Sequence, residues 1–200
     1  MSKSFLSESL QGSLRISSVQ DEYIFFMQKR KEGLLYSLVT TSIIQGIKSI
    51  PVYVEADVSD GMPLFEMVGS LSPEVKESKE RVRTALKNTG YILPAKRITI
   101  NFIPANIKKS GSGFDLPVVA AVLCAIGIVP EDALKDTMVV GEISLSGDVK
   151  PVNGILPMVA EAKERGIVRC FVPAENQTEA LLVKDMKIFA VKSIAEMIHI

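Results

Sequence analysis

Two stretches near the start of the chain alternate between apolar and polar residues, which is the pattern of half-buried β-strands. They run from Tyr36 to Ile44 and from Ser49 to Val58, and Gln45-Gly46 between them permits a tight turn. In the second stretch the apolar residues share one face: Val52, Val54, Ala56 and Val58. The pattern therefore predicts a β-hairpin with one face in the core.

Further along, helix-like and strand-like segments alternate. A short strand over Leu64–Val68 is followed by a helix over Pro73–Asn88, for which Ser72 is a candidate N-cap. The pattern then predicts these elements: a strand over Arg97–Ile103, a helix over Leu116–Val129, a strand over Met138–Ile143, a helix over Gly154–Arg165, a strand over Val168–Val172, a short helix over Ala174–Leu182, a strand over Lys187–Val191 and a helix from Ser193. These segments predict one α+β domain with βαβ-like alternation and a mixed sheet over residues 34–200.

Residues 1–33 differ in composition, being rich in Ser, Lys, Gln and Glu. This composition is typical of a poorly ordered extension, and Met27 is an alternative start of translation.

Bulk composition narrows the function classes. The chain has 200 residues, 47% of them hydrophobic, and its 23 basic residues balance its 23 acidic ones. Zero net charge gives no overall attraction to nucleic acid or to an anionic membrane. Cys124 and Cys170 lie far apart in apolar surroundings, which favours buried thiols. Without an export or membrane-spanning pattern, we expect a cytoplasmic protein with no membrane partner.

The central candidate for chemistry is the turn Lys108–Pro117, where a strand leads into an apolar helix. Ser110 or Ser112 would be the nucleophile of a Ser/Lys mechanism, which also needs a lysine of lowered pKa as base. The candidate bases are Lys108, Lys109 and Lys150, which are all expected in or beside turns. The residue types favour a structural turn, in which Gly111 and Gly113 bend the backbone and Asp115 caps the helix.

The sequence gives little support for nucleotide hydrolysis, metal binding or histidine-based catalysis. The chain contains no G-x-x-x-x-G-K-[ST] string, and Val139-Val140-Gly141-Glu142 lacks the aspartate of a Walker B strand. It has one histidine, His199, and no C-x-x-C pair. We therefore expect no catalytic, cofactor or metal site in this segment.

The helix Pro73–Asn88 carries the best candidate nucleic-acid surface. Its basic residues are Lys76, Lys79, Arg81, Arg83 and Lys87. Interleaved glutamates allow the pairs Glu77–Arg81 and Lys76–Glu80 along the helix. The face is therefore either a solvated or ring-interface surface or a contact for nucleic-acid phosphates.

Four blocks of the sequence, Val54–Phe65, Val75–Leu86, Phe114–Pro117 and Val140–Gly147, resemble the N-terminal domain of the YifB/ComM family of magnesium-chelatase-like AAA+ proteins. The resemblance implies a fold like domain 2 of ribosomal protein S5, as in Lon-type proteases. It also implies an AAA+ ATPase module that binds ATP and magnesium, assembles a hexameric ring and is absent from this chain. Family members with both parts are similar to DNA helicases that act in branch migration during natural transformation.

The resemblance to Lon-type proteases implies that this chain lacks their catalytic serine and lysine. Lon-type proteases carry the nucleophile in a K-D-G-P-S-A-G turn and the lysine in G-E-I-x-L-x-G-x-V-x-P-I-G-G-L-K. The matching positions here are Gly113 and Leu156, so both groups are replaced. Three hypotheses follow: a non-catalytic scaffold or DNA-engaging domain of an AAA+ motor, an active Ser/Lys peptidase, and a free-standing nucleic-acid-binding module.

Overall fold

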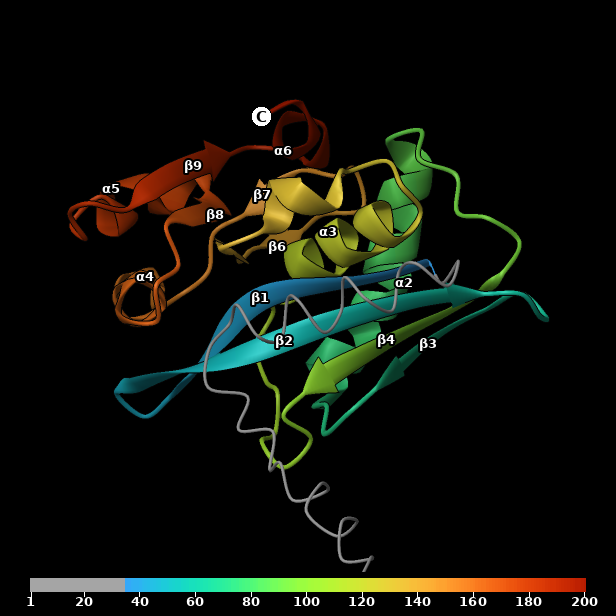
Figure 1. Cartoon of the computed structure of the whole chain (residues 1–200), viewed down its shortest axis with the longest axis horizontal. Coiled ribbons are helices and arrows are strands. Elements are labelled where there is room, and N and C mark those ends of the chain that lie inside the picture. The colour runs from blue at the N-terminus through green and yellow to red at the C-terminus, as the bar shows by residue number, and fades with distance from the viewer. Residues whose placement is uncertain (1–34) are drawn as a thin grey trace, which may run out of the picture.

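The domain is built on one seven-stranded mixed sheet with the strand order β3-β4-β2-β1-β5-β8-β9. The structure is a computed structural model, and it describes residues 35–200 (Figure 1). The strands are β1 (Leu35–Gln45), β2 (Lys48–Ser59), β3 (Leu64–Val68), β4 (Arg97–Ile103), β5 (Thr137–Val139), β8 (Arg169–Pro173) and β9 (Lys187–Val191). A separate two-stranded ribbon consists of β6 (Glu142–Ile143) and β7 (Val149–Lys150).

The predicted hairpin is confirmed as β1 and β2. The two strands pair antiparallel from Leu35↔Val58 to Gln45↔Lys48, which leaves Gly46 and Ile47 as the turn. Gly46 has a φ of 64°, the left-handed conformation that a tight hairpin turn needs. The hairpin is the longest element of the sheet and carries β4 antiparallel on one side and β5 parallel on the other.

The outer strands make the sheet mixed, as predicted. Strand β3 pairs parallel with β4, and β5, β8 and β9 pair parallel in succession. Two helices, α2 (Pro73–Asn88) and α3 (Asp115–Ala125), pack together, with α3 on β1 and β2. The remaining helices are α4 (Ile155–Glu164), α5 (Gln177–Ala180) and α6 (Ile194–His199).

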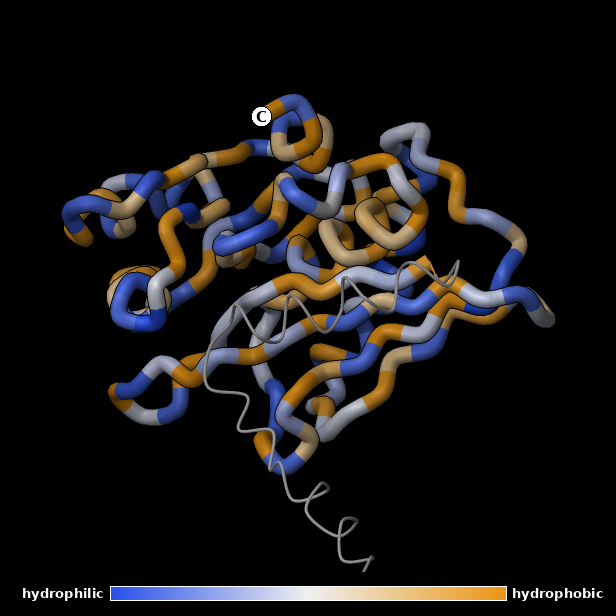
Figure 2. Tube along the Cα trace, in the orientation of Figure 1, coloured by the Kyte–Doolittle hydropathy of each residue, from blue (hydrophilic) through white to orange (hydrophobic). Residues whose placement is uncertain are grey.

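Helix α3 lies at the centre of the core. Every residue from Asp115 to Ala125 is buried, and Figure 2 shows the helix as almost continuously hydrophobic. By contrast, α2 buries one stripe, which includes Val75, Val82 and Leu86. This difference follows from their sequences, because only a helix enclosed on all sides can be apolar all round.

Three element boundaries differ from the predictions. The predicted strand over Met138–Ile143 divides into β5 and β6, and the intervening Gly141 is packed against Leu116 and Val149. A Cβ on Gly141 would lie 3.1 Å from Val149 Cγ1 and 3.2 Å from Leu116 Cδ2, so glycine permits this close approach. The predicted helix over Ala174–Leu182 is a 3₁₀ turn (Ala174–Asn176) followed by α5, and α3 ends at Ala125 rather than near Val129.

The prediction for residues 1–33 lies outside the described residues. Within residues 35–200, none of the helices has the length and apolar character needed to cross a bilayer.

Candidate functional site

The central turn connects β4 to α3 and is anchored to the segment before α2. The Lys109 amide donates to Ser70 O at 2.8 Å, and the Ser72 amide donates to Lys109 O at 2.9 Å. Gly111 follows with a φ of 89°, in the left-handed region that glycine adopts without strain.

Ser110 and Ser112 line a pocket of about 200 Å³. Its other walls come from Ser42–Ile44 of β1, from Val152 and Asn153, and from Met158 of α4. Of the residues that the structure describes, no ionisable side chain lines this pocket. A serine hydroxyl in this pocket is surrounded by apolar, hydroxyl and amide groups, and none of the lining side chains is a base that could take its proton.

The three candidate lysines are placed elsewhere. Lys109 is fully buried, and its Nζ donates to Phe102 O at 3.3 Å and to Pro104 O, at the end of β4. Lys150 is exposed beside Asp148, with 3.6 Å between Nζ and Oδ2. Lys108 is exposed as well, and none of the three lines the pocket with the serines.

Lys109 corrects one expectation from the sequence. The sequence placed Lys109 in or beside a turn, where a lowered pKa is not expected. Burial instead lowers its pKa, because the charged form loses hydration. The ammonium has no carboxylate partner within residues 35–200 and is held by the carbonyls of Phe102 and Pro104, so its role here is to fix the turn against β4.

The position that matches the Lon lysine also lies away from the pocket. Leu156 is the second residue of α4 and is 37% exposed, and its amide donates to Glu179 Oε1 at 2.9 Å. The pocket therefore has neither a lysine at this position nor one brought in from another element.

Gly113 lies in the turn and is also closely packed. Unlike Gly111, it does not adopt a positive φ. Its carbonyl accepts from the Gly141 amide at 3.1 Å, and a Cβ would lie 3.3 Å from Val140 Cγ2. A side chain at this position would therefore press on the chain that links β5 to β6.

Asp115 does not cap α3, contrary to the prediction. It is the first residue of the helix, Phe114 is the N-cap, and no side-chain cap hydrogen bond forms. The fully buried carboxylate instead accepts two bonds from Arg81, from Nε at 2.8 Å and from Nη2 at 3.1 Å. It also accepts from the Ile143 amide at 3.3 Å, so one carboxylate joins α2, α3 and β6.

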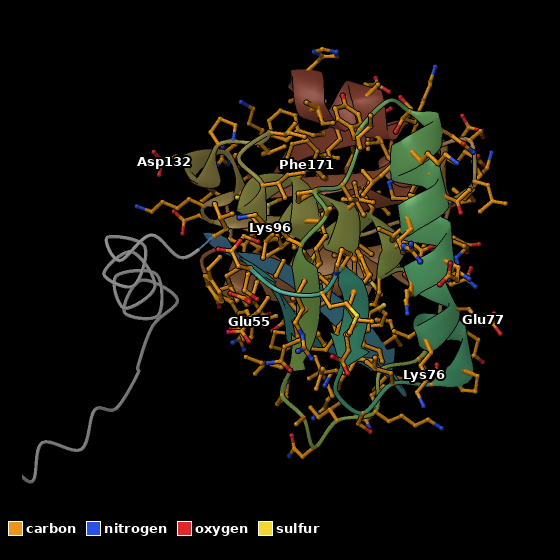
Figure 3. All side chains as sticks on the ribbon, turned by 90° about the vertical axis from the view of Figure 1, so that its right-hand side faces the viewer. Glu55, Lys76, Glu77, Lys96, Asp132 and Phe171 are labelled. Atoms are coloured by element: carbon orange, nitrogen blue, oxygen red, sulfur yellow. The ribbon has the colours of Figure 1, made fainter. Side chains whose placement is uncertain are left out.

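Arg81 is therefore paired and is not one of the cations of α2 that are available to a ligand. The hydrogen bond to Asp115 raises the pKa of Arg81, and its side chain is 24% exposed. The predicted pairing of Arg81 with Glu77 is replaced by this bidentate contact, and Glu80 lies 3.6 Å from Arg83 Nη1 rather than beside Lys76. Figure 3 shows Lys76 and Glu77 on the first turns of α2.

Two other basic residues of α2 contribute to a second pocket, of about 320 Å³, that the sequence did not reveal. Lys79 and Arg83 line it together with Lys96, which lies just before β4. Its apolar lining is Pro63, Leu64, Phe65, Leu93, Pro94, Ala95 and Ile98. The sequence around Lys96 did not indicate this pocket, because only the fold brings the loop Pro94-Ala95-Lys96 beside α2.

Metal and nucleotide chemistry find no support in the arrangement. Among the described residues, no three His, Cys, Asp or Glu side chains are grouped so as to hold a metal ion. The Gly111-Ser112-Gly113 turn is followed by Phe114 rather than a lysine, so its residues do not fit a triphosphate.

Comparisons with known proteins match this domain. A family model described as subunit ChlI of Mg-chelatase matches residues 54–176. The chain is 37% identical over 147 residues to YifB of Escherichia coli and 32% identical over 165 residues to the competence protein ComM of Haemophilus influenzae. These matches cover 74% and 82% of this chain but 29% and 32% of the two relatives.

A protease also matches. Lon protease 2 of Bacillus subtilis is 34% identical over 145 residues, which cover 69% of this chain and 26% of the protease. The chain thus spans less than a third of the length of each of these relatives.

These matches define a magnesium-chelatase-like domain with a Lon-like fold. The chain belongs to this family, in the group of YifB and ComM, as the resemblance in the sequence indicated.

Proposed function

We propose that this domain is a non-catalytic part of a magnesium-chelatase-like AAA+ ATPase, used for ring assembly or DNA engagement. The observation that supports it is the pocket at the central turn, which has serines but no ionisable lining. A Ser/Lys mechanism needs a base within hydrogen-bond reach of the hydroxyl, and the buried Lys109 directs its Nζ to the carbonyls of Phe102 in β4 and of Pro104 just after it.

The second candidate is an active Ser/Lys peptidase. Ser110 and Ser112 both line the pocket, and the chain matches Lon protease 2 over 69% of its length. This candidate needs one lysine to swing into the pocket, and Lys109 would have to leave its two carbonyl acceptors to do so. A free-standing nucleic-acid-binding module is a third candidate, which rests on the basic residues of α2.

The properties of the whole protein are part of the same proposal. They are a downstream module that binds ATP and magnesium, a hexameric ring formed through that module, and branch migration of DNA during natural transformation. We place the protein in the cytoplasm, where a buried thiol such as that of Cys170 stays reduced.

The coding sequence gives the first test. Downstream of the codon for Ile200 we expect a module with G-x-x-x-x-G-K-[ST], and its absence contradicts the assignment to a motor.

The assembled protein gives the second test. Deletion of residues 35–200 from the full-length protein should reduce its ATP-dependent ring, measured by sedimentation, or its DNA-stimulated ATP hydrolysis. An internal control is the ATP hydrolysis of the isolated module without DNA, which should persist. Unchanged assembly and unchanged DNA stimulation together contradict the proposed role.

A further inference from the structure

A basic pocket with an apolar floor lies between α2 and the edge of the sheet. The pocket has a volume of about 320 Å³, within the usual range for ligand pockets of roughly 300–1,000 Å³. Leu64, Leu93 and Ile98 contribute apolar surface, and Leu64 is 44% exposed. An apolar surface left open beside cations suits a ligand that has both a flat apolar part and a negative part.

The charges of this pocket are all of one sign. Lys79, Arg83 and Lys96 line it, and none of its lining residues is acidic. Arg83 and Lys96 have ion-pair partners outside the lining, Glu80 at 3.6 Å and Asp60 at 3.0 Å. Both partners are largely exposed, so these pairs contribute little and an anionic ligand can replace them.

The pocket continues into a basic stripe on α2, defined by Lys76, Lys79, Arg83 and Lys87. Their spacing of three, four and four residues places them on one side of the helix. The eleven residue-to-residue steps from Lys76 to Lys87 rise about 16 Å at about 1.5 Å per residue. That length is longer than one small anion, so the stripe matches an extended polyanion with several phosphates.

The acidic residues on α2 set the limits of this surface. Glu80 lies beside the stripe, and Glu77 lies further around the helix. Arg81 is ion-paired with Asp115 and is therefore not available to a ligand. At the sheet edge, Glu66 is occupied by Arg97 at 3.2 Å. The remaining cations form one continuous track from the helix into the pocket.

We propose that this track binds single-stranded nucleic acid, with phosphates along the basic stripe and one unstacked base against the apolar floor of the pocket. This inference rests on the proposed role in DNA engagement and assigns it a site. A single strand is favoured over a duplex because only an unpaired base is free to leave its stack and enter the pocket.

Binding of fluorescent oligonucleotides to the full chain tests the proposal. The probes are a thymidine 20-mer, the same strand with abasic sites that keep every phosphate, and a duplex of equal length. We expect the 20-mer to bind most tightly and the abasic strand at least several-fold more weakly. Equal binding of all three overturns the base-in-pocket assignment.

Charge-matched variants locate the site. Lys79→Gln/Arg83→Gln/Lys96→Gln should weaken binding at least tenfold at low salt and reduce the slope of log K against log salt by about 2, at about 0.7 per phosphate contact. The control Lys150→Gln/Lys163→Gln/Lys187→Gln removes three exposed lysines outside α2 and the pocket, and should bind like the unmodified protein. Glu80→Gln should act in the opposite direction and tighten binding.

Two results contradict the site. Equal losses in the two triple variants show that the track is not used, and displacement of DNA by polyglutamate at lower charge concentration shows that an acidic peptide is the ligand. Neither result bears on the absence of peptidase activity. DNA binding can therefore fail at this site while the proposed non-catalytic role still holds.

Discussion

Arg81 of α2 and Asp115 of α3 form a bidentate ion pair, with the Asp115 carboxylate fully buried and the Arg81 side chain largely covered. Arg81 Nη2 also donates to Glu74 O at 3.2 Å, so the same guanidinium bonds the first turn of its own helix. The pair joins α2 to α3, the helix that packs on the hairpin, and the Ile143 amide brings β6 to the same carboxylate.

Loss of either member of this pair should destabilise the domain strongly. Arg81→Met leaves a buried carboxylate with the Ile143 amide as its remaining donor, and breaking such a pair typically costs about 3–5 kcal/mol. Urea unfolding should show a loss of this size for Arg81→Met and for Asp115→Ala. Lys79→Met, on the same helix but outside the pair, is the control and should change stability little.

The double variant gives the sharper outcome. Arg81→Met/Asp115→Leu removes both charges, so its loss should be smaller than the sum of the single losses. Additive losses would contradict a direct coupling between the two residues.

The pattern of the sequence predicted most of the fold but only part of these contacts. Alternation located β1 and β2, and Lys187–Val191 was predicted with the bounds that β9 has, because period and propensity are local. The partner of Asp115 is 34 residues earlier in the chain, and a carboxylate at a helix start equally suits a cap. Sequence spacing alone does not choose between these two roles.

The burial of Lys109 was missed for a similar reason. Its neighbours Lys108 and Ser110 are exposed, so the local composition is that of a solvated loop. Tertiary pairing with Ser70 and Ser72 turns this one side chain inward, and only the folded chain shows it.

Lys109 should make the stability of the domain depend on pH in the alkaline range. Burial lowers its pKa below the ordinary value of 10.5, so the unfolded chain binds this proton more tightly than the folded one. The contribution is therefore favourable above pH 10.5 and is lost as the pH falls through the lowered pKa. The free energy of unfolding should rise more with pH in the unmodified protein than in Lys109→Met.

Urea unfolding of both proteins, compared at a series of pH values from neutral to 10.5, checks this difference. Lys108→Met is the neighbouring control, because that side chain is exposed and should leave the pH profile unchanged. Parallel profiles for the unmodified protein and Lys109→Met would show that the buried ammonium does not titrate as argued.

Gly147 should tolerate no side chain. It has a φ of 89°, and a Cβ would lie 2.3 Å from Thr89 Cγ2, while the Thr89 hydroxyl is held by Ala85 O at 2.8 Å. Gly147→Ala should therefore lose roughly 2–5 kcal/mol, from left-handed strain and overpacking together.

The hairpin turn offers the matched control for this change. Gly46 also has a positive φ, but a Cβ there would meet no atom within 4 Å. Gly46→Ala should show only the strain, about 1–2 kcal/mol, in the same unfolding measurement. Equal losses at the two positions would mean that contact with Thr89 adds nothing.

The two thiols should be inert in the folded protein. Burial raises the pKa of Cys170 to about 12, and Cys124 is 1% exposed near the C-terminal end of α3. We expect no reaction with a thiol reagent at pH 8 under native conditions and reaction of both cysteines in denaturant, because the thiolate is the reactive form. Rapid labelling of either cysteine in the native protein would contradict this packing.

The central claim is that the pocket at Ser110 and Ser112 lacks a base and does not cleave peptides. The most direct measurement is the turnover of casein and of fluorogenic peptides at high protein concentration, by the unmodified chain and by Ser112→Ala and Ser110→Ala. We predict that all three give the same rate as buffer. Turnover by the unmodified chain that disappears in Ser112→Ala or in Ser110→Ala would contradict the claim and establish the Ser/Lys peptidase instead.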